Sequence, residues 1–404
     1  MKKFGSTHVV AIVFAIIMVL GILGFFNLNS FIKPVGAAIL YGWDSEKTAS
    51  QNIIAIEDTI ENTVNENIGM KTWFIQINGL LNKVIGKNTI DDVDPSSKVY
   101  KLDNGYLSFV ADKISDENLQ SKASHISELN SFLNEKNIGF LYVQAPYKID
   151  EYDQKLPVSV KDYSVNNAQR LCSMLSSSGV ETLNLIDLIR EQDKDWYSLY
   201  FKTDHHWNNE AAFWAYGELA KRLNADYGFE IDEKHFNPDN YTIRTYEGGF
   251  LGSQGKRVGS TYAGVDDINF FIPNFETSVT YKRDSLIYEG SFDDALLFDE
   301  TGITGSIFND FSYEASMGGN HALITVTNHI ETNGKKVLLV KDSYANPVAT
   351  HLAISVSELD VIDLRYFEAE TNMTLTEYIN QSNPDVVVML YNPNALKDNS
   401  FFNY

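Results

Sequence analysis

The stretch that decides the fold is Lys336-Val337-Leu338-Leu339-Val340-Lys341-Asp342-Ser343-Tyr344-Ala345-Asn346-Pro347. Its first part is a short, largely apolar run, which is typical of a strand buried on both faces of a sheet. A second run of this kind spans residues 386–390. Elsewhere, helical and strand-like segments alternate, with helices expected at 116–135, 165–177 and 209–223, and strands at 138–143 and 181–186. This alternation predicts an α/β domain built on a largely parallel sheet.

The N-terminal segment predicts a membrane anchor. Residues 9–26 carry no charge and follow Lys2 and Lys3, so residues 1–30 are expected to form a cytoplasmic tip and an uncleaved transmembrane signal anchor. The rest of the chain would then lie outside the membrane. A single cysteine, Cys172, excludes an intramolecular disulfide. An exported domain without disulfides suits the surface of a bacterial cell.

Further segments are expected beyond the anchor. Residues 31–95 are expected to form a helical stalk or linker that ends in a charge-rich loop. Residues 96–404 are expected to form one extracytoplasmic domain. Within it, residues 227–328 interrupt the alternation and are rich in Gly, Asn, Tyr and Phe, which indicates a mainly β insertion.

Composition narrows the range of partners. The net charge of −22 argues against nucleic acid or an anionic membrane surface as the main partner. Neutral or weakly charged polymers are still possible partners. The glycine-rich loop at 246–257 lacks the strand-to-helix context of a phosphate-binding loop, so no nucleotide cofactor is expected. That loop is either a substrate contact or a plain surface loop.

The reactive side chains gather in Tyr200-Phe201-Lys202-Thr203-Asp204-His205-His206-Trp207-Asn208. Asp204 and His206 are the residue types that a serine nucleophile needs as orienting acid and base. Ser343 directly follows the buried strand, at the edge where open α/β sheets hold their sites. A spacing of two lets Asp204 and His206 point the same way in an extended segment, with His205 pointing elsewhere.

Two other interpretations of this motif stay open. Asp204, His205 and His206 are all metal-ligand types. Adjacent histidines diverge in an extended chain, however, and no other cluster has ligand spacing, so no metal is expected. The motif could instead be structural, with Asp204 as a turn residue and both histidines packed. Ser343 taken alone would be an ordinary helix cap.

Three blocks together resemble a known family. Asp342-Ser343 resembles the Gly-Asp-Ser block of the SGNH hydrolases, with Lys341 in place of the glycine, and Pro384-Asp385-Val386-Val387-Val388-Met389-Leu390-Tyr391-Asn392 resembles the strand and turn that supply their oxyanion asparagine. Asp204 and His206 precede the serine, as in the circularly permuted relatives typified by the alginate O-acetyltransferases. Thr203-Asp204-His205-His206-Trp207-Asn208 resembles the signature of the DHHW proteins among them. The resemblance covers roughly residues 95–404.

The resemblance implies a fold and a set of roles. The fold would be SGNH-like, that is, a flavodoxin-like and circularly permuted α/β domain. Ser343 would be the nucleophile, His206 the base and Asp204 the carboxylate that orients it. Seven further side chains are expected to line the pocket or bind an oxyanion or substrate: Asn392, Tyr391, Tyr344, His205, Arg365, Gln144 and Lys148.

The resemblance also implies an activity. It predicts an extracytoplasmic enzyme that moves an acyl group, with acetyl as the first choice, onto hydroxyls of a cell-surface polysaccharide or exopolysaccharide. It further implies a multi-spanning membrane O-acyltransferase as partner. The acidic surface suits a neutral or cationic glycan. Two alternatives stay open: a polysaccharide acetylesterase with the same triad, and a non-catalytic glycan-binding assembly protein.

Overall fold

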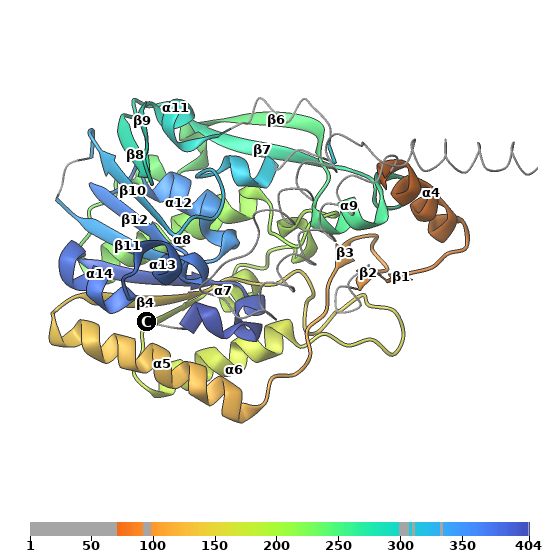
Figure 1. Cartoon of the computed structure of the whole chain (residues 1–404), viewed down its shortest axis with the longest axis horizontal. Coiled ribbons are helices and arrows are strands. Elements are labelled where there is room, and N and C mark those ends of the chain that lie inside the picture. Colours follow the sequence, from red (N-terminus) through yellow and green to blue (C-terminus); the bar gives the residue numbers. More distant parts are fainter. Residues whose placement is uncertain (1–70, 92–97, 299–306, 309–311, 332–333, 403) are drawn as a thin grey trace, which may run out of the picture. The chain divides into compact units, whose positions relative to one another are not determined.

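Figure 1 shows the computed structural model, which describes residues 71–91, 98–298, 307–308, 312–331, 334–402 and 404. The chain divides into two compact units, Met1–Asn78 and Gly79–Tyr404, and the second contains the sheets and the candidate site. Helix α4 comprises Lys71–Val84. The predicted anchor at 9–26 lies outside the described residues. In the part of the chain that is described, no helix combines the length and apolarity needed to cross a bilayer.

An eight-stranded sheet forms the centre of the second unit. Its strands are β4 (Gly139–Gln144), β5 (Thr182–Asn184), β8 (Val279–Arg283), β9 (Leu286–Gly290), β10 (Leu323–Asn328), β11 (Lys336–Lys341), β12 (Glu358–Ile362) and β13 (Val386–Tyr391). Their order is β5-β4-β13-β11-β12-β10-β8-β9. Neighbours from β5 to β12 run parallel, whereas β10, β8 and β9 continue the sheet in antiparallel fashion. The prediction of an α/β fold with a mostly parallel sheet is confirmed, while the circular permutation stays a prediction.

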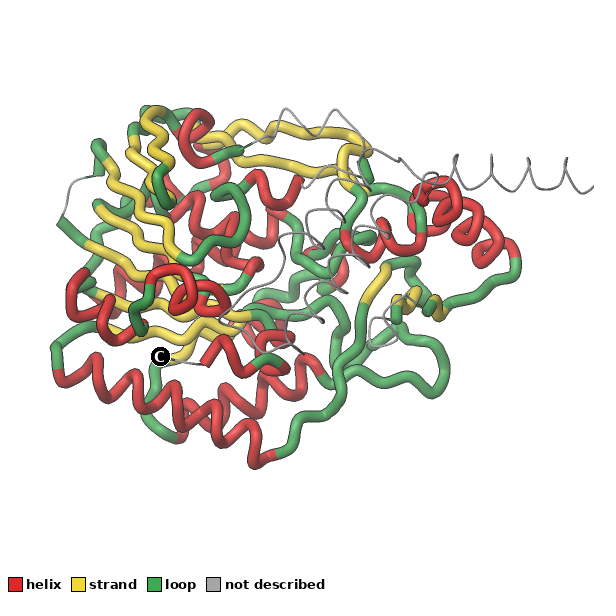
Figure 2. Tube along the Cα trace, viewed as in Figure 1, coloured by secondary structure: helices red, strands yellow, loops and turns green. Residues whose placement is uncertain are grey.

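Helices cover both faces of this sheet (Figures 1 and 2). On one face lie α5 (Asp116–Glu135), α6 (Ser164–Ser177), α13 (Leu364–Thr371) and α14 (Leu375–Ser382), and on the other lie α8 (Asn209–Tyr227) and α12 (Asn346–Leu352). A Cβ added at Gly139 would meet the Tyr227 ring of α8 at 2.5 Å. Tyr378 of α14 donates its hydroxyl to Asp360 of β12 at 2.9 Å. Asp360 lies in register with Phe140, whose side chain faces away from that of position 139.

Two smaller sheets and several short helices complete the unit. They are β1 (Thr89–Ile90), β2 (Val99–Lys101) and β3 (Leu107–Ser108) in one sheet, β6 (Tyr241–Phe250) and β7 (Asp266–Pro273) in the other, and helices α7 (Leu185–Glu191), α9 (Ser253–Val258), α10 (Ser260–Ala263) and α11 (Phe292–Leu296). Strands β6 to β10 fall within residues 227–328, where we predicted a mainly β insertion. Three of them extend the central sheet, and β6 and β7 pair with each other. The domain boundaries at residues 30 and 95 stay predictions.

The central strands are buried as their apolar sequences predict. All six residues of β13 are buried, and Lys336 is the one residue of β11 that is partly exposed. The parallel register aligns Lys341 with Leu390. The turns that follow these strands, at Asp342 and Asn392, therefore open at the same edge of the sheet. This edge holds the candidate site.

Candidate active site

Ser343 occupies the first turn after β11. It begins the short 3-10 helix η6 (Ser343–Ala345), which Asp342 caps by accepting the backbone N–H of Tyr344 at 2.9 Å. The other carboxylate oxygen of Asp342 accepts the backbone N–H and the side-chain amide of Asn392, both at 2.7 Å. Burial raises the pKa of Asp342, although these N–H donors oppose the shift. The carboxylate thus fastens the serine turn to the turn after β13.

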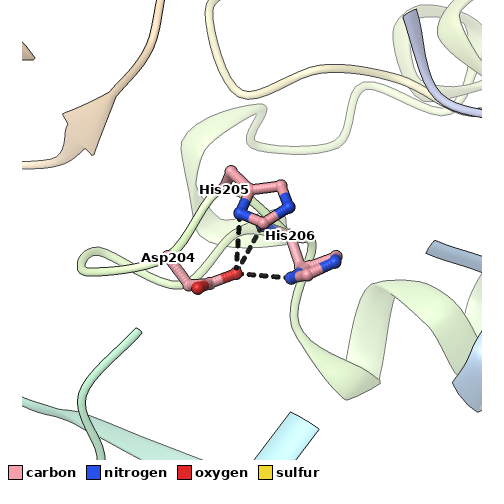
Figure 3. Close-up of side chains that lie close together, drawn as sticks. All are labelled: Asp204, His205 and His206. Carbon is pink, nitrogen blue, oxygen red and sulfur yellow. Dashed lines mark hydrogen bonds and ion pairs between the residues drawn. The ribbon is translucent and has the colours of Figure 1, made fainter. Parts of the chain in front are cut away.

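Asp204, His206 and Ser343 form a continuous line of hydrogen bonds. Nδ1 of His206 lies 2.5 Å from Oδ1 of Asp204, and Nε2 lies 2.7 Å from Oγ of Ser343. Figure 3 shows the first of these contacts. Burial disfavours the charge of Asp204, but the two neighbouring histidines and the N–H of Ser253 hold the pKa of this carboxylate well below its usual range. An ionised Asp204 accepts from Nδ1 and leaves Nε2 free to accept the serine hydroxyl proton.

The Asp204 motif folds as a tight turn. Oδ1 of Asp204 accepts the backbone N–H of His206 at 2.9 Å, so the carboxylate closes the turn that carries its own partner. Trp207 donates its indole N–H to the carbonyl of Tyr344 at 2.9 Å, which ties this turn to the serine turn. The expectation that His205 points away from the other two side chains was wrong. In a turn rather than an extended segment, the rings of His205 and His206 lie side by side, tilted by 37° with centroids 3.8 Å apart, and both approach Asp204 (Figure 3).

The glycine-rich segment 246–257, expected to be a loop without a strand-to-helix context, runs from the end of β6 through a short turn into α9, so that expectation was wrong. This glycine-rich loop contacts Asp204 at the turn. The backbone N–H of Ser253 donates to Oδ2 of Asp204 at 2.5 Å. Gly252 donates its N–H to the hydroxyl of Thr203 at 2.9 Å. A Cβ added at Gly252 would lie 2.1 Å from Cβ of Asp204, although its φ of −70° suits any residue. Glycine is therefore needed here for space, and the loop serves to position the acid.

Two buried charged side chains, Asp266 and Lys148, form hydrogen bonds with the segment that carries Asp204. Asp266 accepts the backbone N–H and the hydroxyl of Thr203 at 2.8 and 2.6 Å. Lys148, which we expected at the pocket, is fully buried and donates to the backbone carbonyls of Asp204 and, at 2.6 Å, of Leu107. Burial lowers the pKa of Lys148 to about 7. Lys148 therefore supports the motif rather than reaching a substrate.

Comparison with known proteins identifies the fold around this line of side chains. Residues 107–267 match the family model of the SGNH hydrolase-like domain, acetyltransferase AlgX. The matched segment contains Asp204 and His206 and ends before Ser343. This match confirms the resemblance seen in the sequence. No curated protein matches the chain.

Two solved structures share the fold of the SGNH-like domain. PatB1 of Bacillus cereus with a sulfonyl adduct has a TM-score of 0.63 at 22% identity, over 78% of this chain and 98% of that one. A DHHW family protein from Eubacterium siraeum has a TM-score of 0.55 at 19% identity, over 78% of this chain and 97% of that one. At these identities the similarity establishes the fold alone.

Three of the expected pocket side chains form hydrogen bonds within the fold instead of lining a pocket. Gln144 is buried and donates its amide to the backbone carbonyl of Tyr391 at 3.0 Å. The hydroxyl of Tyr391 donates to the carbonyl of Phe401 at 2.9 Å. Arg365 makes two hydrogen bonds to the carboxylate of Asp363, at 2.9 and 2.6 Å. These polar groups support the strand ends and contact none of the three side chains of the hydrogen-bonded line.

Two other expected side chains, His205 and Tyr344, adjoin that line, and a third, Asn392, bonds to the residue that precedes Ser343. Asn392 is fixed by Asp342, with one of its two amide hydrogens directed at the carboxylate. Tyr344 donates its hydroxyl to the backbone carbonyl of His205. Nδ1 of His205 lies 2.9 Å from Oγ of Ser253, and burial together with the neighbouring imidazole lowers the pKa of His205 to about 3. His205 is therefore a neutral ring beside the site.

Lys341 takes the place of the glycine in the family's serine block, and its side chain is fully buried. Its ammonium donates to the amide oxygens of Asn320 and Asn346 at 2.6 and 2.7 Å, and lies 3.9 Å from the carboxylate of Asp363. Burial lowers the pKa of Lys341 to about 8. The lysine holds the segment at Asn320 against the start of α12, and the serine turn forms without the glycine.

Asp204, His205 and His206 are close enough to be considered as metal ligands. One ligand atom from each lies within 4.8 Å of the others (Figure 3). Oδ1 of Asp204 already accepts the ring and backbone N–H groups of His206, and Oδ2 accepts the N–H of Ser253. Nε2 of His206 meets Ser343. A metal ion would have to replace these bonds, whereas a Ser-His-Asp triad would use them as they stand.

Sequence reasoning missed the ring that covers His206. Tyr313, in the 3-10 helix η5 (Ser312–Ala315), stacks on the imidazole with centroids 4.0 Å apart and an interplanar angle of 14°. No motif marks this tyrosine. It comes from the Tyr- and Phe-rich stretch at 227–328, and tertiary packing alone brings it to the site.

Proposed function

We propose that this protein is an O-acetyltransferase of a bacterial cell surface, which transfers an acetyl group to hydroxyls of a cell-surface polysaccharide or exopolysaccharide. The observation that carries the proposal is the line Asp204–His206–Ser343, with contacts of 2.5 and 2.7 Å at the carboxyl edge of the sheet. The matched family, described as an acetyltransferase domain, supports acetyl as the group transferred.

The first half of the reaction loads the serine. Nε2 of His206 takes the proton of Ser343 while Oγ forms a bond to the acyl carbonyl carbon. The bond from that carbon to the donor's leaving group then breaks, and the leaving group takes the proton from His206. Asp204 stays ionised and stabilises the imidazolium between these steps. The product is an acetyl ester of Ser343.

The second half of the reaction transfers the acetyl group from Ser343 to the acceptor. A sugar hydroxyl gives its proton to His206 and attacks the ester carbon, the bond to Ser343 breaks, and the serine oxygen takes the proton back. Both tetrahedral intermediates carry an oxyanion. The backbone N–H of Ser343 begins helix η6 and so has no partner within that helix, and the side-chain amide of Asn392 has a second hydrogen besides the one given to Asp342. We assign the oxyanion to these two donors.

The setting of the enzyme is part of the proposal. The apolar segment 9–26 would anchor the protein in the membrane with its SGNH-like domain outside. A multi-spanning membrane O-acyltransferase would supply the acyl group, and a polysaccharide would receive it. The structure of PatB1 contains a sulfonyl adduct. Sulfonyl electrophiles modify activated nucleophiles, so we expect Ser343 to react in the same way.

An acetyl-ester assay tests the proposal. The purified full chain is given a chromogenic acetyl ester, with and without oligosaccharide acceptors, and free acetate and acetylated sugar are both measured. Ser343→Ala and His206→Ala should abolish turnover, whereas Ser131→Ala, on the exposed side of α5, should not. Acetate alone would identify an esterase. Glycan binding without turnover would identify a binding protein. Full activity in both active-site variants would refute the triad.

A further inference from the structure

The imidazole of His206 is enclosed by two other rings. Tyr313 stacks on it with centroids 4.0 Å apart, and His205 with centroids 3.8 Å apart at an interplanar angle of 37°. Two rings cannot occupy the same face of an imidazole at such distances. The two neighbours therefore take opposite faces, and only the ring edges of His206, toward Asp204 and Ser343, are left for hydrogen bonds.

The Tyr313 ring is held rigidly in this stack. It is 4% exposed, and its hydroxyl donates to the backbone carbonyl of Tyr344 at 3.3 Å. The same carbonyl accepts the indole N–H of Trp207 at 2.9 Å. Phe201 meets Tyr313 edge to face, with centroids 6.3 Å apart. Tyr313 therefore contacts both segments of the site: its hydroxyl bonds to the residue after Ser343, and its ring packs on His206.

We infer that Tyr313 is a positioning residue for His206, which holds the imidazole in line between Asp204 and Ser343 and stabilises its protonated form during the reaction. This inference rests on the proposed function. A face packed at 4.0 Å leaves no room for the imidazole to rotate out of line. The face of an aromatic ring is also electron-rich and attracts a cation that lies over it.

His205 completes the stack as the neutral partner. Two imidazolium rings at 3.8 Å would repel each other, so only one of the pair can hold the proton. The lowered pKa of His205, about 3, leaves that role to His206. The titratable groups facing His206 are Asp204, His205, Tyr313, Tyr344 and, more distantly, Glu314.

Two substitutions at one position separate the ring from its hydroxyl. Tyr313→Phe keeps the stacked face, so the kcat for the acetyl ester should stay within about threefold of the wild type. Tyr313→Leu removes the face, and kcat should fall by about tenfold or more with little change in KM. Loss of imidazolium stabilisation also moves the acidic limb of the pH–rate profile to lower pH, by about 0.5–1 unit. A purely structural role would lower the folded fraction and leave that limb in place.

A titration without turnover makes the test independent of the proposed activity. The full chain is labelled with 13C at histidine Cε1, and the His206 resonance is followed with pH in the wild type, in both Tyr313 variants and in Glu314→Gln. Tyr313→Leu should lower the titration midpoint, and Tyr313→Phe should not. Glu314→Gln reports how far this neighbouring carboxylate contributes. If folded Tyr313→Leu keeps the wild-type midpoint and pH profile, or if Phe is as damaging as Leu, the inference is overturned.

Discussion

Gly252→Ala is the sharpest perturbation that the site offers, because it adds one methyl group at the point where the glycine-rich loop touches Asp204. The added Cβ would lie 2.1 Å from Cβ, 2.5 Å from Cα and 2.6 Å from Oδ2 of Asp204. The backbone at Gly252 has φ −70° and ψ 178°, which alanine adopts without strain. Any effect therefore comes from the contact with Asp204 and not from backbone conformation.

The contact sets the size of the effect. Real Cβ contacts rarely fall below 3 Å, so either the loop or Asp204 must move by about 1 Å to relieve an approach of 2.1 Å. Overpacking of this kind costs about 1–3 kcal/mol of stability. Loss of the Ser253 N–H from Oδ2 of Asp204 would add about 1–3 kcal/mol. A 1 Å displacement of a group that orients the base costs about a hundredfold in rate.

The assay measures kcat/KM for a chromogenic acetyl ester together with thermal unfolding. Gly252→Ala should lose about two orders of magnitude in kcat/KM and melt earlier than the wild type. Gly217→Ala is the matched control, because a Cβ there meets nothing closer than 3.6 Å, in the middle of α8. That variant should keep full activity, and its free energy of unfolding should rise by about 0.5–1 kcal/mol. Wild-type activity in folded Gly252→Ala would refute the claim that the loop positions the acid.

Further predictions concern the groups around the acid and the serine turn. Asp204→Asn should stay folded and lose on the order of 10³–10⁴ in kcat, because a neutral amide cannot fix the imidazole tautomer; a loss below tenfold would contradict this. Burial lowers the pKa of Lys148 from an unfolded value near 10.4 to about 7, so the unfolded chain binds more protons in this window and stability should rise with pH from about 7 to 10. Lys148→Met should flatten that rise of stability with pH, as measured by denaturant titrations at several pH values. An unchanged pH dependence would contradict the prediction. Arg365→Ala should destabilise by about 3–5 kcal/mol in chemical unfolding, because it leaves the buried Asp363 carboxylate without its two-bond partner; a loss under about 1 kcal/mol would show that Lys341 suffices.

The central strands could be predicted because short, largely apolar runs indicate strands that are buried on both faces. The apolar runs at 336–340 and 386–390 lie in β11 and β13, paired in parallel, and their carboxyl ends bring Ser343 and Asn392 to one edge. Periodicity does not say which strands become neighbours. Strands β8, β9 and β10 therefore read as an insertion, although they extend the central sheet.

The surroundings of the triad could not be predicted in the same way. The rotation of His205 follows from a turn closed by Asp204 itself, and an alternation rule for extended chain does not apply there. Tyr313 and Gly252 reach the site through tertiary packing, which leaves no local pattern in the chain. Lys148 was expected over the site because its segment follows a strand, yet backbone carbonyls satisfy its ammonium inside the fold.

Trapping of the covalent intermediate tests the central claim most directly. The full chain is incubated with an acetyl ester, quenched in acid and digested, and the modified peptide is identified by mass spectrometry. A parallel sample receives a sulfonyl fluoride. The account predicts one acetyl group, and one sulfonyl group, on Ser343 of the wild type, and neither label in Ser343→Ala. Acetylation on another side chain, or undiminished labelling of Ser343→Ala, would contradict it.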